Sequence, residues 1–188
     1  QANGKTEMWD IIDAEPNAQN ITGLKKGTTP QELIKKLENK TLDEILVFEP
    51  VKKGDVVFIP AGRVHATGKG ILLAEIQQTS DLTYRLYDYN RVDAKGNQRE
   101  LHIEEALEAI DFKLNGSAKI SPQIQDNTLS TIIDCPYFTT NLLTPEHKTE
   151  RDYANLDSFV ILICTSGSCK IFTMKRPGLK HSGKGKQC

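Results

Sequence analysis

The sequence has few cysteines and no long apolar run, and each shortage excludes a class of protein. Its four cysteines all lie after residue 134 and form no Cys-x-x-Cys pair. A disulfide framework or a zinc knuckle is therefore not indicated, and we expect reduced thiols in a reducing, cytoplasmic compartment. No apolar stretch approaches the roughly 20 residues of a membrane span, and no signal-peptide pattern opens the chain. We therefore expect no membrane partner.

An excess of charge of one sign is also absent. The 188 residues carry 24 Lys and Arg against 25 Asp and Glu, a net charge of −1. Five of the basic residues and no acidic residue lie in residues 175–188, which leaves 19 basic against 25 acidic residues, or −6, in residues 1–174. This basic tail has no periodicity and is predicted to be disordered. A nucleic-acid binder that uses the tail is the least favoured interpretation, so we expect no nucleic-acid partner.

The sequence does contain short apolar runs separated by Pro, Gly and Asp, a pattern typical of antiparallel strands and turns. At 38% hydrophobic residues, the chain can bury one good-sized core. Strands are predicted within residues 6–13, 45–60, 70–78 and 82–90, and the pattern resumes over residues 131–144 and 158–174.

Two segments have the period of amphipathic helices. Residues 28–41 begin with Thr29 as N-cap, Pro30 at the first helical position and Glu32 at the third, which together form a capping box. Residues 102–112 have apolar side chains at i, i+3, i+4 and i+7. We expect two helices, near residues 29–39 and 102–112, packed outside a mainly β core.

The stretch GDVVFIPAGRVHATGKG, residues 54–70, places one histidine after a turn and a strand. Gly54 and Asp55 make the turn, and Gly62 lets the backbone bend so that His65 points back into the sheet. The pattern G-D-x-x-x-x-P-x-G-x-x-H matches the second motif of the cupin superfamily, small β-barrels that hold a divalent metal. A structural histidine is the alternative.

Two further stretches carry polar residues at strand spacing. In GKTEMW, Lys5 and Glu7 lie two residues apart and hence on one face of a strand. If that face is the interior, their burial requires a compensating metal or substrate; the alternative is a solvent-facing ion pair. Residues 75–91, EIQQTSDLTYRLYDYNR, are too polar for a structural strand, although surface strands alternate in the same way. The sets that share a face are Glu75 with Gln77, and Thr83 with Arg85 and Tyr87.

Together, GKTEMW, VFIPAGRVHA and EIQQTSDLTYRLYDYNR resemble the bacterial type I mannose-6-phosphate isomerases, zinc enzymes of the cupin fold. The resemblance runs from residue 1 to about residue 174. It implies a mainly β protein with an incomplete cupin-type, jelly-roll β-barrel. Residues 1–112 would form the partial barrel that carries the metal and active-site motifs, and residues 113–174 would start a C-terminal β-domain.

The resemblance also implies the chemistry. Glu7 and His65 would be zinc ligands for one zinc ion per chain, and Arg85 would be the active-site arginine. Lys5 and Glu75 would serve in proton transfer or in holding the sugar phosphate. The family interconverts mannose 6-phosphate and fructose 6-phosphate through an enediolate, so the sequence predicts a zinc-dependent isomerase of carbohydrate metabolism. Either Lys5 or Glu75 could be the base, and Lys5, Arg63 and Arg85 are all candidates to anchor the phosphate.

The chain departs from the family pattern at both ends. A Q-x-H pair that supplies two more zinc ligands normally precedes GKTEMW and is absent here, and residues 175–188 match nothing expected. We therefore expect a chain truncated at both ends, with weak or no zinc binding and little activity. A non-catalytic, sugar-binding cupin is the alternative function. The sequence gives no indication of the oligomeric state.

Overall fold

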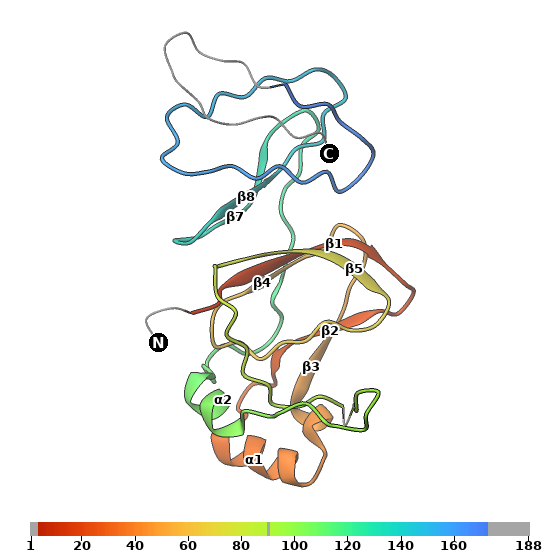
Figure 1. Ribbon diagram of the computed structural model, residues 1–188, viewed down its shortest axis with the longest axis vertical. Helices are drawn as coiled ribbons and strands as arrows, with labels where there is room; N and C mark the ends of the chain where they lie inside the picture. Colours follow the sequence, from red (N-terminus) through yellow and green to blue (C-terminus); the bar gives the residue numbers. More distant parts are fainter. Residues whose placement is uncertain (1–3, 90, 173–188) are drawn as a thin grey trace. The chain divides into compact units, whose positions relative to one another are not determined.

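The computed structural model describes residues 4–89 and 91–172 (Figure 1). Contacts divide the chain into two units, Gln1–Arg151 and Asp152–Cys188, and every helix and strand of the described residues belongs to the first. Within residues 4–89 and 91–172, no helix combines the length and the apolar character that crossing a bilayer requires. The predicted disordered tail, residues 175–188, lies outside the described residues.

A four-stranded antiparallel sheet with the order β5-β1-β4-β6 positions the residues of interest. In its register, Glu7 lies opposite Ile59 of β4 and Gln77 of β5, and Trp9 lies opposite Val57 and Glu75. The strand bounds are Glu7–Ala14 for β1, Val56–Ile59 for β4, Ile71–Gln77 for β5 and Lys119–Ile120 for β6.

Two smaller antiparallel pairs complete the strands. β2 (Gln19–Leu24) pairs with β3 (Leu46–Pro50), and β7 (Ser130–Asp134) forms a hairpin with β8 (Thr139–Leu142). The predicted strands over 6–13, 45–60, 70–78 and 131–144 are confirmed. β2 and the short β6 were not predicted, since QNITGL lacks the apolar alternation of a strand.

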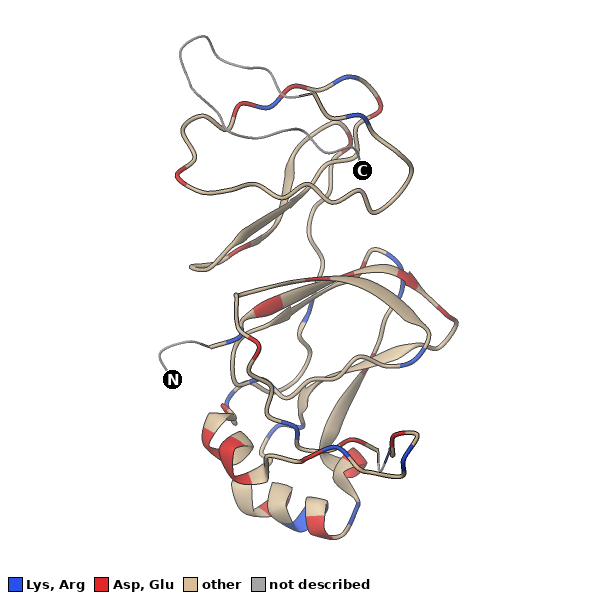
Figure 2. Ribbon diagram, viewed as in Figure 1, with Lys and Arg blue, Asp and Glu red and all other residues tan. Residues whose placement is uncertain are grey.

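Both predicted helices are confirmed, as α1 (Pro30–Glu38) and α2 (Ile103–Ala109), and a short 3-10 helix, η1 (Leu42–Ile45), follows α1. Thr29 Oγ1 accepts a hydrogen bond of 3.1 Å from the backbone N–H of Glu32, so the N-cap is formed as predicted. The outer face of α2 is acidic and that of α1 carries mixed charge (Figure 2).

The two faces of the four-stranded sheet bury different clusters, because successive side chains of a strand point to opposite faces. One face carries Trp9, Ile11, Val57 and Ile59. The other buries Met8 and Val56 against Ile132 and Ile133 of the β7–β8 hairpin. A third cluster joins β2, β3 and both helices through Ile21, Leu46, Leu33 and the half-buried Leu107. The predicted class, mainly β with two outer helices, is confirmed.

Two predicted strands do not form. Residues 82–89 and 91–102 contain one isolated bridge, Val92 with Gln98, and no strand, so the expectation of a strand over 82–90 is wrong. The expected strands within 158–174 are likewise wrong for residues 158–172, where Phe159 is 80% exposed and Ile161 70% exposed. The predicted division into residues 1–112 and 113–174 stays a prediction.

Candidate active site

The start of β1 brings three chemically distinct side chains to one face. Lys5, Glu7 and Trp9 alternate along the chain, so they point the same way. Glu7 is fully buried and Trp9 is 2% exposed, whereas Lys5 keeps 23% of its side chain exposed. This face is the interior one, and the alternative of a solvent-facing Lys5–Glu7 ion pair is wrong.

The loop after β4 carries His65 to the same place. Gly62 has φ +89°, which favours glycine, and a Cβ there would lie 3.0 Å from the carbonyl oxygen of Ala109. The backbone N–H of Asp111 also donates to the Gly62 carbonyl at 3.0 Å, so the loop is held against the end of α2. His65 Nε2 lies 2.9 Å from Glu7 Oε1.

The hydrogen bonds of His65 decide which ring nitrogen faces Glu7. Nδ1 lies 2.8 Å from the Arg63 carbonyl oxygen, which can only accept, so Nδ1 carries a hydrogen. Nε2 faces the buried oxygen Glu7 Oε1 and can donate to it only when the ring carries a second hydrogen, because in the neutral ring Nε2 is a lone pair. Two lone pairs 2.9 Å apart repel each other unless a proton or a metal cation lies between them.

Glu7 also has a permanent cation beside it. Lys5 Nζ donates to Glu7 Oε2 at 2.7 Å. Burial acts to raise the pKa of the Glu7 carboxyl, but the hydrogen bonds and charges of His65 and Lys5 outweigh it and lower that pKa below its usual value. Glu7 is therefore a carboxylate at neutral pH.

Glu75 stands next to this group on β5. Its Oε1 accepts from Lys5 Nζ at 3.4 Å and its Oε2 accepts from Trp9 Nε1 at 3.1 Å. The side chain of Glu75 is 37% exposed, so it can meet a solute. The two carboxylates and Lys5 together carry a net charge of −1. A bound divalent cation would change the charge to +1, which suits an anionic substrate.

Of the predicted site residues, the structure brings together Lys5, Glu7, His65 and Glu75, but it does not join Arg85 to them by any hydrogen bond or ion pair of the described residues. Arg85 is half-buried in the loop between β5 and α2. Its backbone N–H donates to His102 Nδ1 at 3.3 Å, and its guanidinium donates to the Glu100 carbonyl at 3.4 Å. The shared strand face expected for Thr83, Arg85 and Tyr87 does not exist, because that strand does not form.

Arg63, one of the three candidate phosphate anchors, is bound to the backbone. Its guanidinium donates to the carbonyl oxygens of Thr22, at 2.6 Å, and Gly116, at 3.0 Å. Burial lowers the pKa of Arg63, and the charge of Glu49 acts in the opposite direction. The side chain is thus committed to fixing the loop that carries His65.

Trp9 was missed in the sequence analysis. Its indole contacts Glu75 and lies edge-on to the His65 ring, with ring centroids 5.4 Å apart and an interplanar angle of 71°. A signal for it did exist, because Trp9 continues the i, i+2, i+4 alternation of Lys5 and Glu7.

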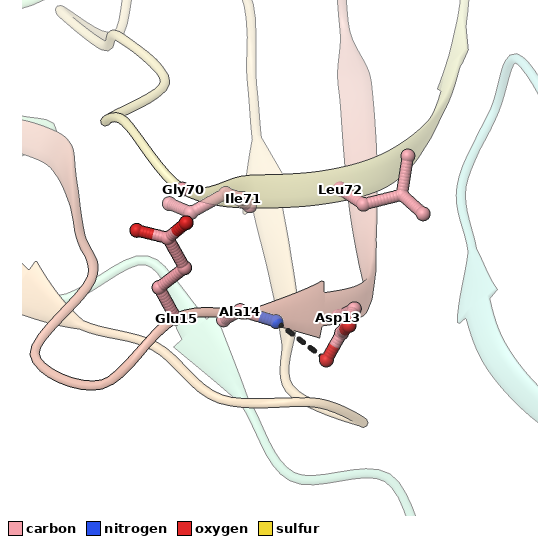
Figure 3. Close-up of a pocket in the computed structure, with 6 residues that line it drawn as sticks. All are labelled: Asp13, Ala14, Glu15, Gly70, Ile71 and Leu72. Carbon is pink, nitrogen blue, oxygen red and sulfur yellow. Dashed lines mark hydrogen bonds between the residues drawn. The ribbon is translucent and has the colours of Figure 1, made fainter.

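A separate cavity of about 400 Å³ lies at the other end of the β1–β5 pair (Figure 3). Its charged lining consists of Asp13 and Glu15, next to Gly70. Strand β1 carries Glu7 at its first residue and reaches this cavity at its last, Ala14, so the cavity is distinct from the Lys5–Glu7–His65–Glu75 cluster.

Comparisons with known proteins relate the chain to one group of enzymes. No protein-family model matches the chain. Over 138 residues, 72% of the chain, it is 46% identical to mannose-6-phosphate isomerase ManA of Bacillus subtilis, and over 139 residues it is 37% identical to mannose-6-phosphate isomerase of Streptococcus mutans. The crystal structure of mannose 6-phosphate isomerase from Bacillus subtilis matches 72% of the chain with a TM-score of 0.64 and 37% identity.

These matches define a mainly β protein related to sugar-phosphate isomerases. The chain is a homologue of the bacterial mannose-6-phosphate isomerases, and the resemblance predicted from its motifs is confirmed. It spans less than half of the length of these relatives, 44% of the Bacillus subtilis ManA protein and 43% of the Streptococcus mutans protein.

Proposed function

We propose that the chain carries an aldose–ketose isomerase site for mannose 6-phosphate and fructose 6-phosphate, on a partial cupin-type barrel. The observation that carries the proposal is the fully buried Glu7 carboxylate, whose oxygen Oε1 faces His65 Nε2 at 2.9 Å. The names of the relatives supply the reaction and the sugar-phosphate substrate.

Glu7 and His65 fit a divalent cation such as zinc. Carboxylate oxygen and imidazole nitrogen are both zinc ligands, and the hydrogen bond from His65 Nδ1 to the Arg63 carbonyl leaves Nε2 available to a metal. When bound, the metal supplies Lewis-acid polarisation of a substrate oxygen. The residues that the structure describes contain no group of three or more His, Cys, Asp or Glu side chains placed to hold a metal, so two ligands remain and zinc binding should be weak.

Glu75 is the better candidate for the base, because Lys5 acts as a hydrogen-bond donor in this arrangement. Lys5 Nζ donates to Glu7 and Glu75, whereas Glu75 keeps 37% of its side chain exposed. In the proposed reaction the Glu75 carboxylate removes the proton from C2 of mannose 6-phosphate, and the electron pair moves to the C1 carbonyl oxygen to form an enediolate. The proton then returns to C1, while a proton moves between the two oxygens. Lys5 stabilises the developing negative charge.

Arg85 keeps its proposed role in binding the substrate oxyanion or phosphate. Its one guanidinium contact, with the Glu100 carbonyl, is 3.4 Å long and easily exchanged for a substrate oxygen. Of the three candidate phosphate anchors, Lys5 and Arg85 remain. Arg63 is bound to two backbone carbonyls and is the least available.

The test follows the C2 proton of mannose 6-phosphate by proton NMR in D2O, with excess zinc and the full 188-residue chain. We expect slow loss of the C2 signal that disappears in Glu75→Gln, and zinc that is lost on dialysis. Binding of the sugar phosphate without loss of the signal would favour the alternative, a non-catalytic sugar-binding cupin. If the chain neither bound the sugar phosphate nor exchanged the C2 proton, the proposed function would be contradicted. Tight, stoichiometric zinc binding would contradict the weak two-ligand site.

A further inference from the structure

The indole of Trp9 contacts both Glu75 and the ring of His65. Trp9 and Glu75 are paired residues of β1 and β5, so their side chains leave the sheet on the same face next to each other. The indole is 2% exposed and lies among Ile11, Val57 and Ile59, and this packing leaves its ring little freedom to turn.

We propose that Trp9 is a positioning residue that fixes the Glu75 carboxylate in the orientation needed for proton transfer. The inference rests on the proposed function, because that function gives Glu75 its role as the base. The hydrogen bond between Trp9 and Glu75 is observed independently of that function. Trp9 does not need to touch the substrate, because it acts through Glu75.

The hydrogen bonds of Glu75 show why the indole sets the orientation. Each carboxylate oxygen has one donor, Lys5 Nζ on Oε1 at 3.4 Å and Trp9 Nε1 on Oε2 at 3.1 Å. The lysine ammonium is the weaker constraint, because its bond is longer and it is shared with Glu7 at 2.7 Å. Its stem is flexible, whereas the indole N–H points in one direction from a packed ring. With one lone pair of Oε2 occupied, the remaining lone pairs of Glu75 face a fixed direction.

The chain contains one tryptophan, which gives this proposal a direct readout. The protein has a single indole N–H resonance, and its chemical shift and its exchange with solvent report on the acceptor of that hydrogen. A charged acceptor shifts the resonance and slows exchange relative to a free indole.

The first experiment records this resonance in the wild-type chain, in Glu75→Ala and in Glu75→Gln. We expect a large shift and faster hydrogen exchange in Glu75→Ala, and a smaller shift in Glu75→Gln, which keeps a neutral acceptor. The control is Glu150→Ala, because Glu150 is 60% exposed and is paired with Lys148. An unchanged resonance in Glu75→Ala would overturn the proposal whether or not the chain is an isomerase.

The second experiment measures the rate of C2 proton exchange in Trp9→Phe, which keeps an aromatic ring and removes the N–H. We expect about 10-fold or more loss in kcat with little change in KM. A wild-type kcat in Trp9→Phe, or a KM that rises as kcat falls, would overturn the proposal. Circular dichroism checks the folding of each variant. If the wild-type chain exchanges no proton, the proposed function fails for it and the indole resonance alone decides the position of Glu75.

Discussion

Glu7 and Glu49 are two buried carboxylates of the same unit, and their surroundings differ in kind. Glu49, at 9% exposure, accepts from Thr22 Oγ1 at 3.0 Å, from the Ala118 backbone N–H at 3.2 Å and from Ser117 Oγ, so both of its oxygens are satisfied. Glu7 is less exposed still, and one of its oxygens accepts from Lys5 while the other lies 2.9 Å from His65 Nε2, where a proton or a metal cation must lie between the two atoms.

The difference separates Glu49, a structural carboxylate, from Glu7, a carboxylate available to bind a cation. Buried polar groups are normally satisfied, because an unpaired one costs free energy, so a buried oxygen without a donor needs an explanation. The loop after β4 contributes a side chain near each carboxylate. Arg63 donates to the Thr22 carbonyl of β2, beside Glu49, and His65, two residues later, faces Glu7. A cation bound between Glu7 and His65 would satisfy the oxygen that the protein leaves free.

The same substitution at the two carboxylates gives the strongest test of this comparison. Glu49→Gln removes the negative charge near the half-buried Arg63 and weakens hydrogen bonds to a charged acceptor. We expect a loss of about 2 kcal/mol in the free energy of unfolding, measured by urea denaturation. A loss below about 0.5 kcal/mol, the range of ordinary surface substitutions, would mean that the Glu49 network is not structural.

Glu7→Gln should affect zinc binding more than the free energy of unfolding. The new amide N–H can donate to His65 Nε2, which partly offsets the loss of the charged hydrogen bond from Lys5, so the metal-free chain should lose about 1 kcal/mol or less. Zinc binding should fall by about 10-fold or more, because the amide is a poorer ligand than the carboxylate. The measurements are urea denaturation without metal and calorimetric titration with zinc. Unchanged zinc binding would remove Glu7 from the metal site.

The sequence predicted the part of this comparison that depends on local pattern. Alternation placed Lys5 and Glu7 on one face, and the glycine-punctuated loop brought His65 to them. It did not predict β2, because Asn20 and Thr22 are polar yet fully buried, and their burial depends on partners distant in sequence, such as Glu49 and the backbone of Gly68. The structural carboxylate was therefore missed for a tertiary reason.

The failed strands show the limit of alternation as evidence. Residues 159–164 form a continuous apolar run of the kind that predicts a strand, but a strand is stable only when a neighbour takes its hydrogen bonds and covers its apolar face. Ile163 is 59% exposed and Phe172 81% exposed, so no such cover exists among the described residues. In the loop after β5, ion pairs of the buried Asp88 with Arg91 and Arg99 hold the chain in an irregular path. The residue pattern shows neither whether a neighbouring segment will cover a strand nor which ion pairs will form between distant residues.

The smallest expected effect concerns a third carboxylate, Asp10, on the opposite face of β1 from Glu7. Burial raises the pKa of Asp10 above its ordinary value of 3.8. The folded chain therefore binds this proton more tightly than the unfolded chain. The free energy of unfolding should fall as the pH rises from the unfolded pKa through the raised folded pKa, and the cost should be fully present at neutral pH.

Asp10→Asn removes that charge, so it should stabilise the chain at neutral pH by about 1 kcal/mol or less and flatten the fall in stability across this acidic window. Urea denaturation at several pH values measures both effects, with the exposed Asp157→Asn as the control. If Asp10→Asn instead destabilised the chain at neutral pH, Asp10 would have a favourable partner like that of Glu49. The two carboxylates of β1 would then differ in their hydrogen bonds and not in the face of the strand that they occupy.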